Sequence, residues 1–285
     1  MIKKFRKMVF ELLSKKAIYA SVKSNKEHME MWNKSKNIFN SLHDHFTGGE
    51  VDDETEYRIR FLITAEAAFI KSEVQRIISI KNKCNYLDIG DSDGSVRLLL
   101  EKIIDNPGFK TMGVNLQKSA VEKIRSKGME ALHMNAMDVG KTGVNYDVVS
   151  LFETLEHLSD PIGFLEQIHN IVGQKLVISV PFVRRSRVSL RYLEARPIAD
   201  NINIENVHIF ELSGDDWKKI FLHTGWKVEN EWSLLQFPKF GILRLIMQTY
   251  WRMVSFEGFW FVSLTKDMKF RNSYKIESND IKQQE

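Results

Sequence analysis

The sequence predicts an α/β protein whose sheet is mostly parallel and covered by helices on both faces. From Cys84 onward, short apolar runs alternate with helical patterns, an order that is typical of parallel strands joined by helices. The runs are CNYLDIG, KTMGVNL, EALHM, YDVVSLF and QKLVISVP. They are apolar throughout rather than alternating, which indicates strands buried on both sides.

Residues 1–80 are predicted to form a helical extension before this sheet. EYRIRFLITAEAAFIKSEVQRIISI has apolar residues at helical spacing and contains neither Gly nor Pro. The first 20 residues, MIKKFRKMVFELLSKKAIYA, read as a basic amphipathic helix whose apolar face comprises Ile2, Phe5, Met8, Val9, Leu12 and Leu13. Such a face either packs on its own domain or makes a peripheral membrane or partner contact.

After Pro181 the pattern is a long connection and then a helix near 213–223. A strand GWKVENEWSLL, an aromatic helical stretch KFGILRLIMQTYWRMV and a final strand GFWFVSLTK follow. The aromatic stretch could be core, a dimer face or a cover over a hydrophobic substrate. We therefore expect an extension at 1–80, one α/β domain at 81–266 and a polar, flexible tail at 267–285.

Composition excludes several classes of protein. The net charge of +4 does not by itself indicate nucleic acid. The single cysteine, Cys84, excludes an intramolecular disulfide and a cysteine-based zinc site. No apolar run approaches the roughly 20 residues that span a bilayer, and the N-terminus lacks a signal-peptide core. We expect a cytoplasmic protein, with peripheral membrane attachment as the alternative.

The turn YLDIGDSDGS joins an apolar strand to a helix and carries Asp88, Gly90 and Gly94. Glycines allow a tight bend and a close approach of a ligand, and ligands of open α/β sheets bind beyond the carboxyl ends of the strands. A calcium loop is excluded because Ile89 and Leu100 occupy positions that need carboxylates. A phosphate-binding P-loop is excluded because its Gly-Lys-Ser/Thr ending is absent, and a dinucleotide fingerprint because Ser92 occupies a position that needs glycine.

Six segments in order resemble class I S-adenosylmethionine-dependent methyltransferases over residues 84–266. They are YLDIGDSDGS, MGVNLQKSAVEKIR, ALHMNAMDV, YDVVSLFETLEHLSDPIGFLEQIHNIV, KLVISVP and GDDWKKIFLHTGWKV. The resemblance is to methyltransferase domains of types 11 and 23. It implies a Rossmann-like seven-stranded sheet with an antiparallel last strand, in which GWKVENEWSLL and GFWFVSLTK form the final pair.

The resemblance also implies roles around S-adenosylmethionine. Asp88 would orient the methionine ammonium, Asn115 would meet the ribose hydroxyls, and Asp138 with Met137 and Ala136 would border the adenine. The implied cofactor-binding set is Asp88, Gly90, Asp91, Gly94, Asn115, Leu116, Met137, Asp138 and Phe152. Ser92 and Asn115 depart from the family pattern, which predicts weaker binding, help from Asp91 or Asp93, or a non-catalytic scaffold.

FETLEHLSDP places Glu153, Glu156 and His157 at spacing i, i+3, i+4, so a helical turn would turn all three the same way. The Glu-x-x-Glu-His pattern is similar to the metal site of ubiquinone-biosynthesis O-methyltransferases and small-RNA 2′-O-methyltransferases. Those families supply a further histidine downstream, here His208. The four side chains could bind Mg²⁺, Mn²⁺ or Zn²⁺, act as acid and base without metal, or be structural.

The loop PFVRRSRVSLRYLEARP lies where the family places substrate contacts. Its arginines, Arg184, Arg185, Arg187, Arg191 and Arg196, could bind phosphate or carboxylate, or could be a solvated surface. We expect O-methylation of a small acceptor or of a lipid- or nucleotide-linked sugar, with a quinone precursor also fitting. A metal-dependent RNA 2′-O-methyltransferase is the alternative enzyme, although the chain shows no recognisable RNA-binding module.

Overall fold

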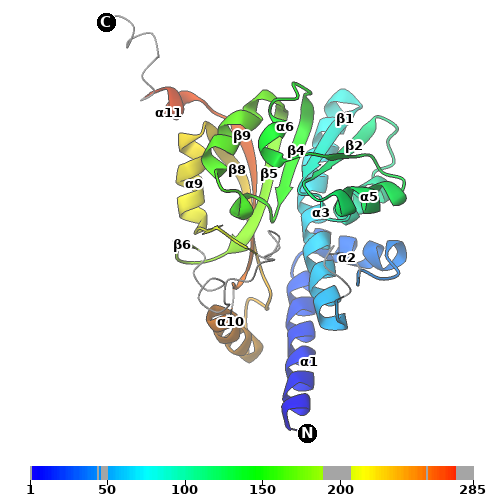
Figure 1. The fold of residues 1–285 in the computed structure, drawn as a ribbon. Helices are drawn as coiled ribbons and strands as arrows, with labels where there is room; N and C mark the ends of the chain where they lie inside the picture. Colours follow the sequence, from blue (N-terminus) through cyan, green and yellow to red (C-terminus); the bar gives the residue numbers. More distant parts are fainter. Residues whose placement is uncertain (1, 44, 46–50, 189–206, 255, 274–285) are drawn as a thin grey trace, which may run out of the picture.

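The computed structural model of the chain describes residues 2–43, 45, 51–188, 207–254 and 256–273. Its centre is a seven-stranded sheet in the order β3-β2-β1-β4-β5-β9-β8 (Figure 1). The strands are β1 (Cys84–Ile89), β2 (Phe109–Asn115), β3 (Ala131–His133), β4 (Tyr146–Phe152), β5 (Val172–Phe182), β8 (Trp226–Leu235) and β9 (Gly258–Lys266). The strands β1 to β5 pair in parallel, whereas β9 runs antiparallel to both β5 and β8. The predicted sheet and its final strand pair are therefore confirmed.

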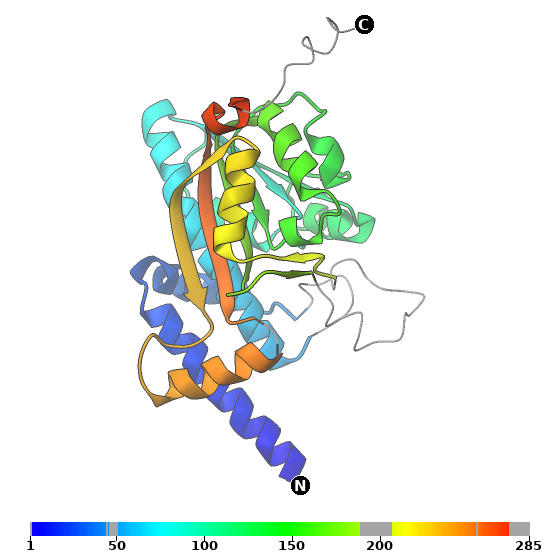
Figure 2. The same cartoon turned by 90° about the vertical axis from the view of Figure 1, so that its left-hand side faces the viewer.

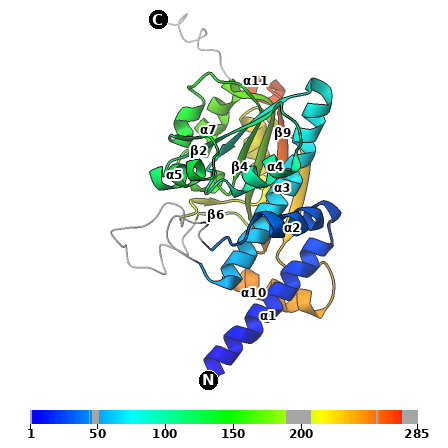
Figure 3. The same cartoon turned by 90° about the vertical axis from the view of Figure 1, so that its right-hand side faces the viewer.

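Helices cover both faces of this sheet, as the apolar strands predicted. On one face, Tyr86, Val148 and Val177 pack with α2 (Lys26–Ile38), α3 (Asp53–Lys81) and α4 (Ser95–Ile103) (Figure 3). On the other face, Val149 and Ile178 pack with α7 (Pro161–Gln167) and α9 (Gly214–His223) (Figure 2). Neighbouring residues along each strand thus reach opposite cores, which is why the strands read as continuous apolar runs.

Shorter elements complete the described chain. The helices are α5 (Lys118–Ser126), α6 (Ala136–Val139), α10 (Ile242–Val254) and α11 (Lys269–Asn272), with 3₁₀ turns η1 (Leu155–His157) and η2 (Ile168–Asn170). Strands β6 (Arg187–Val188) and β7 (Phe210–Glu211) form a separate antiparallel pair. Of the predicted tail at 267–285, residues 274–285 lie outside the described residues.

The N-terminal extension folds as three helices, α1 (Ile2–Lys23), α2 and α3, and the last two share a core with the sheet. The N-terminus of α3 is capped by Asp52, whose side chain accepts a hydrogen bond from the Thr55 amide at 3.0 Å. Its C-terminus closes on Asn82 in the left-handed conformation, two residues before β1 begins. The wall that α3 forms is therefore fixed to the strand that carries Asp88.

Helices α1 and α10 lie together at the end of the molecule opposite the C-terminus (Figures 1 and 2). The Phe10 and Tyr250 rings lie 4.2 Å apart between them. Of the apolar face predicted for the first helix, Leu13 packs here, whereas Met8, Val9 and Leu12 are exposed; the side chains of Ile2 and Phe5 lie outside the described residues. None of the described helices has the length and apolarity that crossing a bilayer requires.

Candidate active site

A cavity of about 990 Å³ opens at the carboxyl ends of β1, β2 and β4. This volume is at the upper end of the range for small-molecule sites, so it has room for a cofactor and part of a second ligand. One side is formed by residues 88–96, 114–117, 134–137, 152–154 and 157–159. The other side is formed by α3, by α10 and by Phe10 of α1.

Asp88 lies in this cavity at the end of β1 with only 2% of its surface exposed. Burial raises the pKa of Asp88 to about 6, and the Ser150 hydroxyl, which donates to its Oδ1 at 2.6 Å, opposes that rise. Next to it, Gly90 has φ of 83°, and a Cβ there would lie 2.1 Å from Thr154 Oγ1. A glycine is thus needed for this turn to pass Thr154 and leave Asp88 facing the cavity.

Asp91 and Asp93 both pair with protein cations. Asp91 Oδ2 accepts from Arg97 Nε at 2.5 Å, and the Arg97 side chain is fully buried. Asp93 lies 2.8 Å from His45 Nδ1 and 2.6 Å from Lys127 Nζ. Although burial alone would raise it, these two cations hold the pKa of Asp93 well below its usual range. Both carboxylates hold the turn in place through these pairs. The contribution to cofactor binding that the sequence predicted for Asp91 or Asp93 would therefore come from their backbone atoms.

Asn115 ends β2 at the cavity, where its Oδ1 accepts the Gln117 amide hydrogen at 2.8 Å. Because the carbonyl end is used this way, its amide nitrogen is the end that can donate to a ribose hydroxyl. Leu116, Met137 and Phe152 line the cavity as predicted residues. Asp138 does not line it, since its carboxylate pairs with Lys141 at 2.6 Å on the surface.

The prediction that Glu153, Glu156 and His157 share one helical face is wrong. The 3₁₀ turn begins at Leu155, and Glu153 precedes it in the left-handed region with φ of 45°. Its Oε1 accepts from Ser179 Oγ of β5 at 3.0 Å. Glu153 therefore lines the cavity apart from the other two side chains.

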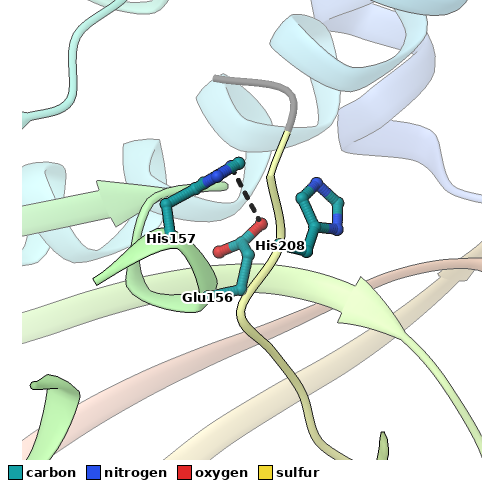
Figure 4. A group of neighbouring side chains, drawn as sticks. All are labelled: Glu156, His157 and His208. Carbon is teal, nitrogen blue, oxygen red and sulfur yellow. Dashed lines mark ion pairs between the residues drawn. The ribbon is translucent and has the colours of Figure 1, made fainter. Parts of the chain in front are cut away.

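Glu156, His157 and His208 do come together, as Figure 4 shows. Each offers a ligand atom, and these atoms lie within 4.8 Å of one another. Glu156 is fully buried, and neither of its oxygens accepts a hydrogen bond from another described side chain. Burial, reinforced by Glu153, raises the pKa of Glu156 well above its ordinary value. The Glu156 Oε1 lies 3.9 Å from His157 Nε2, the contact drawn as a dashed line in Figure 4. A buried carboxyl without a hydrogen-bond donor is costly unless a proton or a cation satisfies it.

Both imidazoles are held through Nδ1. His157 Nδ1 donates to the Val207 carbonyl at 2.8 Å, and His208 Nδ1 lies 3.2 Å from Glu211 Oε1. Arg187 donates to the other oxygen of Glu211. This arrangement directs Nε2 of each ring to a ligand or a proton, as in oriented histidines of metal and acid–base sites.

The sequence analysis missed Glu66, which α3 brings into the cavity at 4% exposure. Its Oε1 lies 3.5 Å from Ser179 Oγ, the hydroxyl that also contacts Glu153. Burial, then Glu153 and Asp88, raise the pKa of Glu66 well above its ordinary value, and burial raises that of Glu153 to about 8. Helical spacing in a long apolar helix gave no signal that this glutamate faces a ligand cavity.

An aromatic wall, which comprises Phe10, Tyr250, Trp251, Phe256 and Phe259, closes the far side of the cavity. Arg58 of α3 lies over the Trp251 ring, with Cζ 4.5 Å from its centroid, and its Nε donates to Gln236 at 3.2 Å. Guanidinium stacking of this kind combines an apolar surface with a positive charge. The sequence showed the aromatic stretch of α10 but not that it meets α3 across the cavity.

The predicted substrate arginines lie away from the cavity lining. Arg184 pairs with Glu257 at 2.7 Å and Arg187 with Glu211, while Arg185 is exposed. Arg191 and Arg196 lie outside the described residues. Arg187 contributes indirectly, because it holds the carboxylate that orients His208.

A family model described as a methyltransferase domain matches residues 59–231, more than half of the chain. The protein therefore belongs to this family and is a class I S-adenosylmethionine-dependent methyltransferase. Its cofactor is S-adenosylmethionine, and the buried Asp88 carboxyl and the Asn115 amide offer donors and acceptors that suit it. No curated protein matches the sequence.

Solved structures show the same fold at low identity. A putative sarcosine dimethylglycine methyltransferase from Galdieria sulphuraria is 12% identical, with a TM-score of 0.54 over 76% of this chain and 88% of that one. The O-methyltransferase of a trans-AT polyketide synthase multienzyme from Brevibacillus brevis, in complex with S-adenosylhomocysteine, is 14% identical, with a TM-score of 0.51 over 74% of each chain. The [4+2]-cyclase SpnF is 12% identical, with a TM-score of 0.50 over 72% of this chain and 81% of that one.

Proposed function

We propose that the protein methylates a hydroxyl oxygen of an amphiphilic acceptor, such as a lipid-linked or nucleotide-linked sugar. The observation that carries this proposal is the shared cavity, which His157, His208, Arg58 and the aromatic wall line together. An apolar wall with a stacked guanidinium suits an acceptor that has an apolar part and an anionic part. S-Adenosylmethionine supplies an activated methyl group, so the protein must chiefly align the acceptor oxygen and exclude water.

In this proposal Asp88, as the carboxylate, binds the methionine ammonium of the cofactor, and Asn115 donates to the ribose. His157 Nε2 takes the proton of the acceptor hydroxyl, because Nδ1 already donates to Val207. Glu153 has a pKa raised to about 8 by burial, so at neutral pH it is protonated and can donate a hydrogen bond to the acceptor.

We further propose an alternative to this role as a base, in which His157 joins Glu156 and His208 in binding a divalent cation. Three observations fit Mg²⁺, Mn²⁺ or Zn²⁺: the buried Glu156 carboxyl receives no hydrogen bond from a described side chain, both imidazoles are oriented through Nδ1, and the three ligand atoms lie within 4.8 Å of one another. A bound cation would lower the pKa of an acceptor hydroxyl. Glu153 is not a metal ligand in this proposal, because its carboxyl contacts Ser179. It hydrogen-bonds the acceptor instead.

A metal-dependent RNA 2′-O-methyltransferase would use the same three ligands. RNA binding calls for a row of cations for phosphates and exposed aromatic faces for bases. Among the described residues, the acceptor side of the cavity is mostly apolar, which favours the amphiphile. An RNA acceptor would show steeply salt-dependent turnover, whereas a sugar or lipid acceptor would not.

The test measures cofactor binding, metal binding and turnover separately. Calorimetry gives the affinity for S-adenosylmethionine, and release of S-adenosylhomocysteine is followed with lipid-linked sugars, nucleotide sugars and RNA. Glu156→Gln and His157→Gln should keep cofactor affinity within about twofold and lower turnover roughly 100-fold. Glu73→Gln is the control, because Glu73 is also a buried glutamate but is not part of the cluster of Glu156, His157 and His208.

Each part can fail independently. Manganese binding that is unchanged in Glu156→Gln would remove the metal site but leave His157 as a base. Absence of S-adenosylmethionine binding to the wild type would instead support the scaffold that the departures Ser92 and Asn115 suggested. Turnover with RNA alone would replace the amphiphilic acceptor.

A further inference from the structure

The outward face of α10 is apolar. Ile242, Leu245 and Ile246, at spacing i, i+3 and i+4, are exposed by 77%, 64% and 50%, and Phe240 just before the helix by 82%. The inward face is also apolar, since Met247 and Trp251 are buried against α1. A helix on the surface of a soluble domain usually turns one apolar stripe inward and keeps the other side polar. The second stripe of α10 is not needed for the core of this chain.

Helix α1 carries exposed apolar residues as well. Met8, Val9 and Leu12 are exposed by 57%, 38% and 55%. The two helices are in contact and lie at the same end of the molecule, where α1 projects from the body (Figures 1 and 2). We call the exposed apolar residues Met8, Val9, Leu12, Phe240, Ile242, Leu245 and Ile246 the α1–α10 surface. Such a large apolar area marks an interaction site.

Charge identifies the partner. The segment 237–254 contains Lys239, Arg244 and Arg252 and no acidic residue. Residues 1–23 contain seven basic residues, Lys3, Lys4, Arg6, Lys7, Lys15, Lys16 and Lys23, against one acidic residue, Glu11. A second copy of the chain would bring these like charges together, whereas an anionic lipid headgroup layer would be attracted to them.

We propose that the α1–α10 surface docks this enzyme on an anionic phospholipid bilayer, with its apolar residues at the boundary of headgroups and acyl chains. Apolar residues flanked by lysine and arginine are the composition of helices that lie in this boundary. Phe10, Tyr250 and Trp251 lie at the α1–α10 contact and also line the cavity. Docking therefore sets the aromatic wall next to the bilayer, where an amphiphilic acceptor would be presented. The docking itself needs no methyl transfer and is tested without it.

The first experiment is sedimentation of the full chain with vesicles of phosphatidylcholine alone or mixed with phosphatidylglycerol. We expect binding to the mixed vesicles that weakens with salt, and binding of the double variant Ile242→Ser, Ile246→Ser that is weaker by about tenfold or more. Ile80→Ser is the matched control, because Ile80 is 74% exposed and lies outside the α1–α10 surface. It lies on the last turn of α3, near the start of β1, whereas the cavity lies at the other end of β1. Equal binding by the double variant and the wild type would overturn the proposal.

A second measurement locates the contact. Leu245→Cys, labelled with an environment-sensitive fluorophore, should shift to shorter wavelength with the mixed vesicles, whereas labelled Ile80→Cys should not. The labelling is specific because the native cysteine, Cys84, is fully buried. An unshifted label would overturn the proposal even if the chain sediments with vesicles. A dimer by light scattering that the double variant dissociates, without vesicle binding, would show that a second copy covers the surface.

Discussion

The acidic residues of the turn after β1 and three further glutamates, Glu66, Glu153 and Glu156, differ in their partners. Asp91 and Asp93 pair with Arg97, His45 and Lys127, and the Arg97 guanidinium opposes the rise that burial causes in the pKa of Asp91. Burial also raises the pKa of Glu66, Glu153 and Glu156, and Glu153 raises the pKa of the other two further. The first group stabilises the fold, whereas the second keeps an electrostatic cost that a ligand can relieve.

The largest expected effect comes from breaking a paired carboxylate. Arg97→Met leaves Asp91 buried without its partner, so the free energy of unfolding should fall by about 3–5 kcal/mol. Chemical denaturation measures this change. The control Lys118→Met removes an exposed pair with Glu122 and should change stability by less than about 0.5 kcal/mol. A loss in Arg97→Met no larger than in the control would contradict the structural role of the pair.

Asp88→Ala should weaken S-adenosylmethionine binding roughly 100-fold, because the ammonium loses its buried counter-charge. Calorimetry checks the affinity. Asp138→Asn makes a sharper comparison, since the carboxylate of Asp138 pairs with Lys141 and lies outside the cavity lining. We expect it to stay within about twofold of the wild type, and a large loss there would restore the adenine role that the sequence suggested for that side chain.

Removing the Glu66 carboxyl should change stability in the opposite direction to Arg97→Met. Glu66→Gln replaces a buried acid by a neutral group of similar shape, so the ligand-free enzyme should gain about 0.5–2 kcal/mol of stability at neutral pH. Thermal unfolding measures the gain. Glu73→Gln loses the ion pair with Arg76, although its side-chain oxygen can still accept from Asn230, so it should destabilise slightly instead. Stability changes of the same sign in Glu66→Gln and Glu73→Gln would contradict the proposed difference between these two glutamates.

The smallest effect is a pH dependence. The pKa of Asp88 is raised from 3.8 to about 6, so the folded, ligand-free enzyme holds a proton that the unfolded chain has released. Its contribution to stability should therefore fall as the pH rises from 3.8 to about 6. The affinity for S-adenosylmethionine should rise as the pH passes about 6, by at most roughly tenfold per unit, and Asp88→Asn should remove this slope. A flat affinity profile in the wild type would refute the ionised Asp88.

Local sequence patterns predicted the parts of the molecule that depend on neighbours in the chain. The turn from Asp88 to Gly94 needs glycines where φ is positive, and the buried strands need continuous apolar runs. The order of these segments then identified the family and the sheet.

The site depends on contacts between distant segments, which local patterns do not show. Asp91 and Asp93 looked available because their partners, Arg97, His45 and Lys127, carry no signal of pairing. The spacing of the sequence placed Glu153 on a helical turn. Its left-handed backbone instead follows from its position at the end of β4 and from its contact with Ser179. Glu66 resembled any glutamate of a long helix until the packing of α3 on the sheet turned it inward.

The acceptor side of the cavity is assembled from both ends of the chain, since α1 and α3 precede the sheet strands and α10 lies between the last two. Apart from His45, which contacts Asp93, the side with the turn after β1 comes from the segments between α3 and α10. Redesign of acceptor choice in this enzyme therefore requires the N-terminal helices and α10 to be exchanged as a matched pair. Exchanging only one of them would leave a cavity whose walls fit different acceptors.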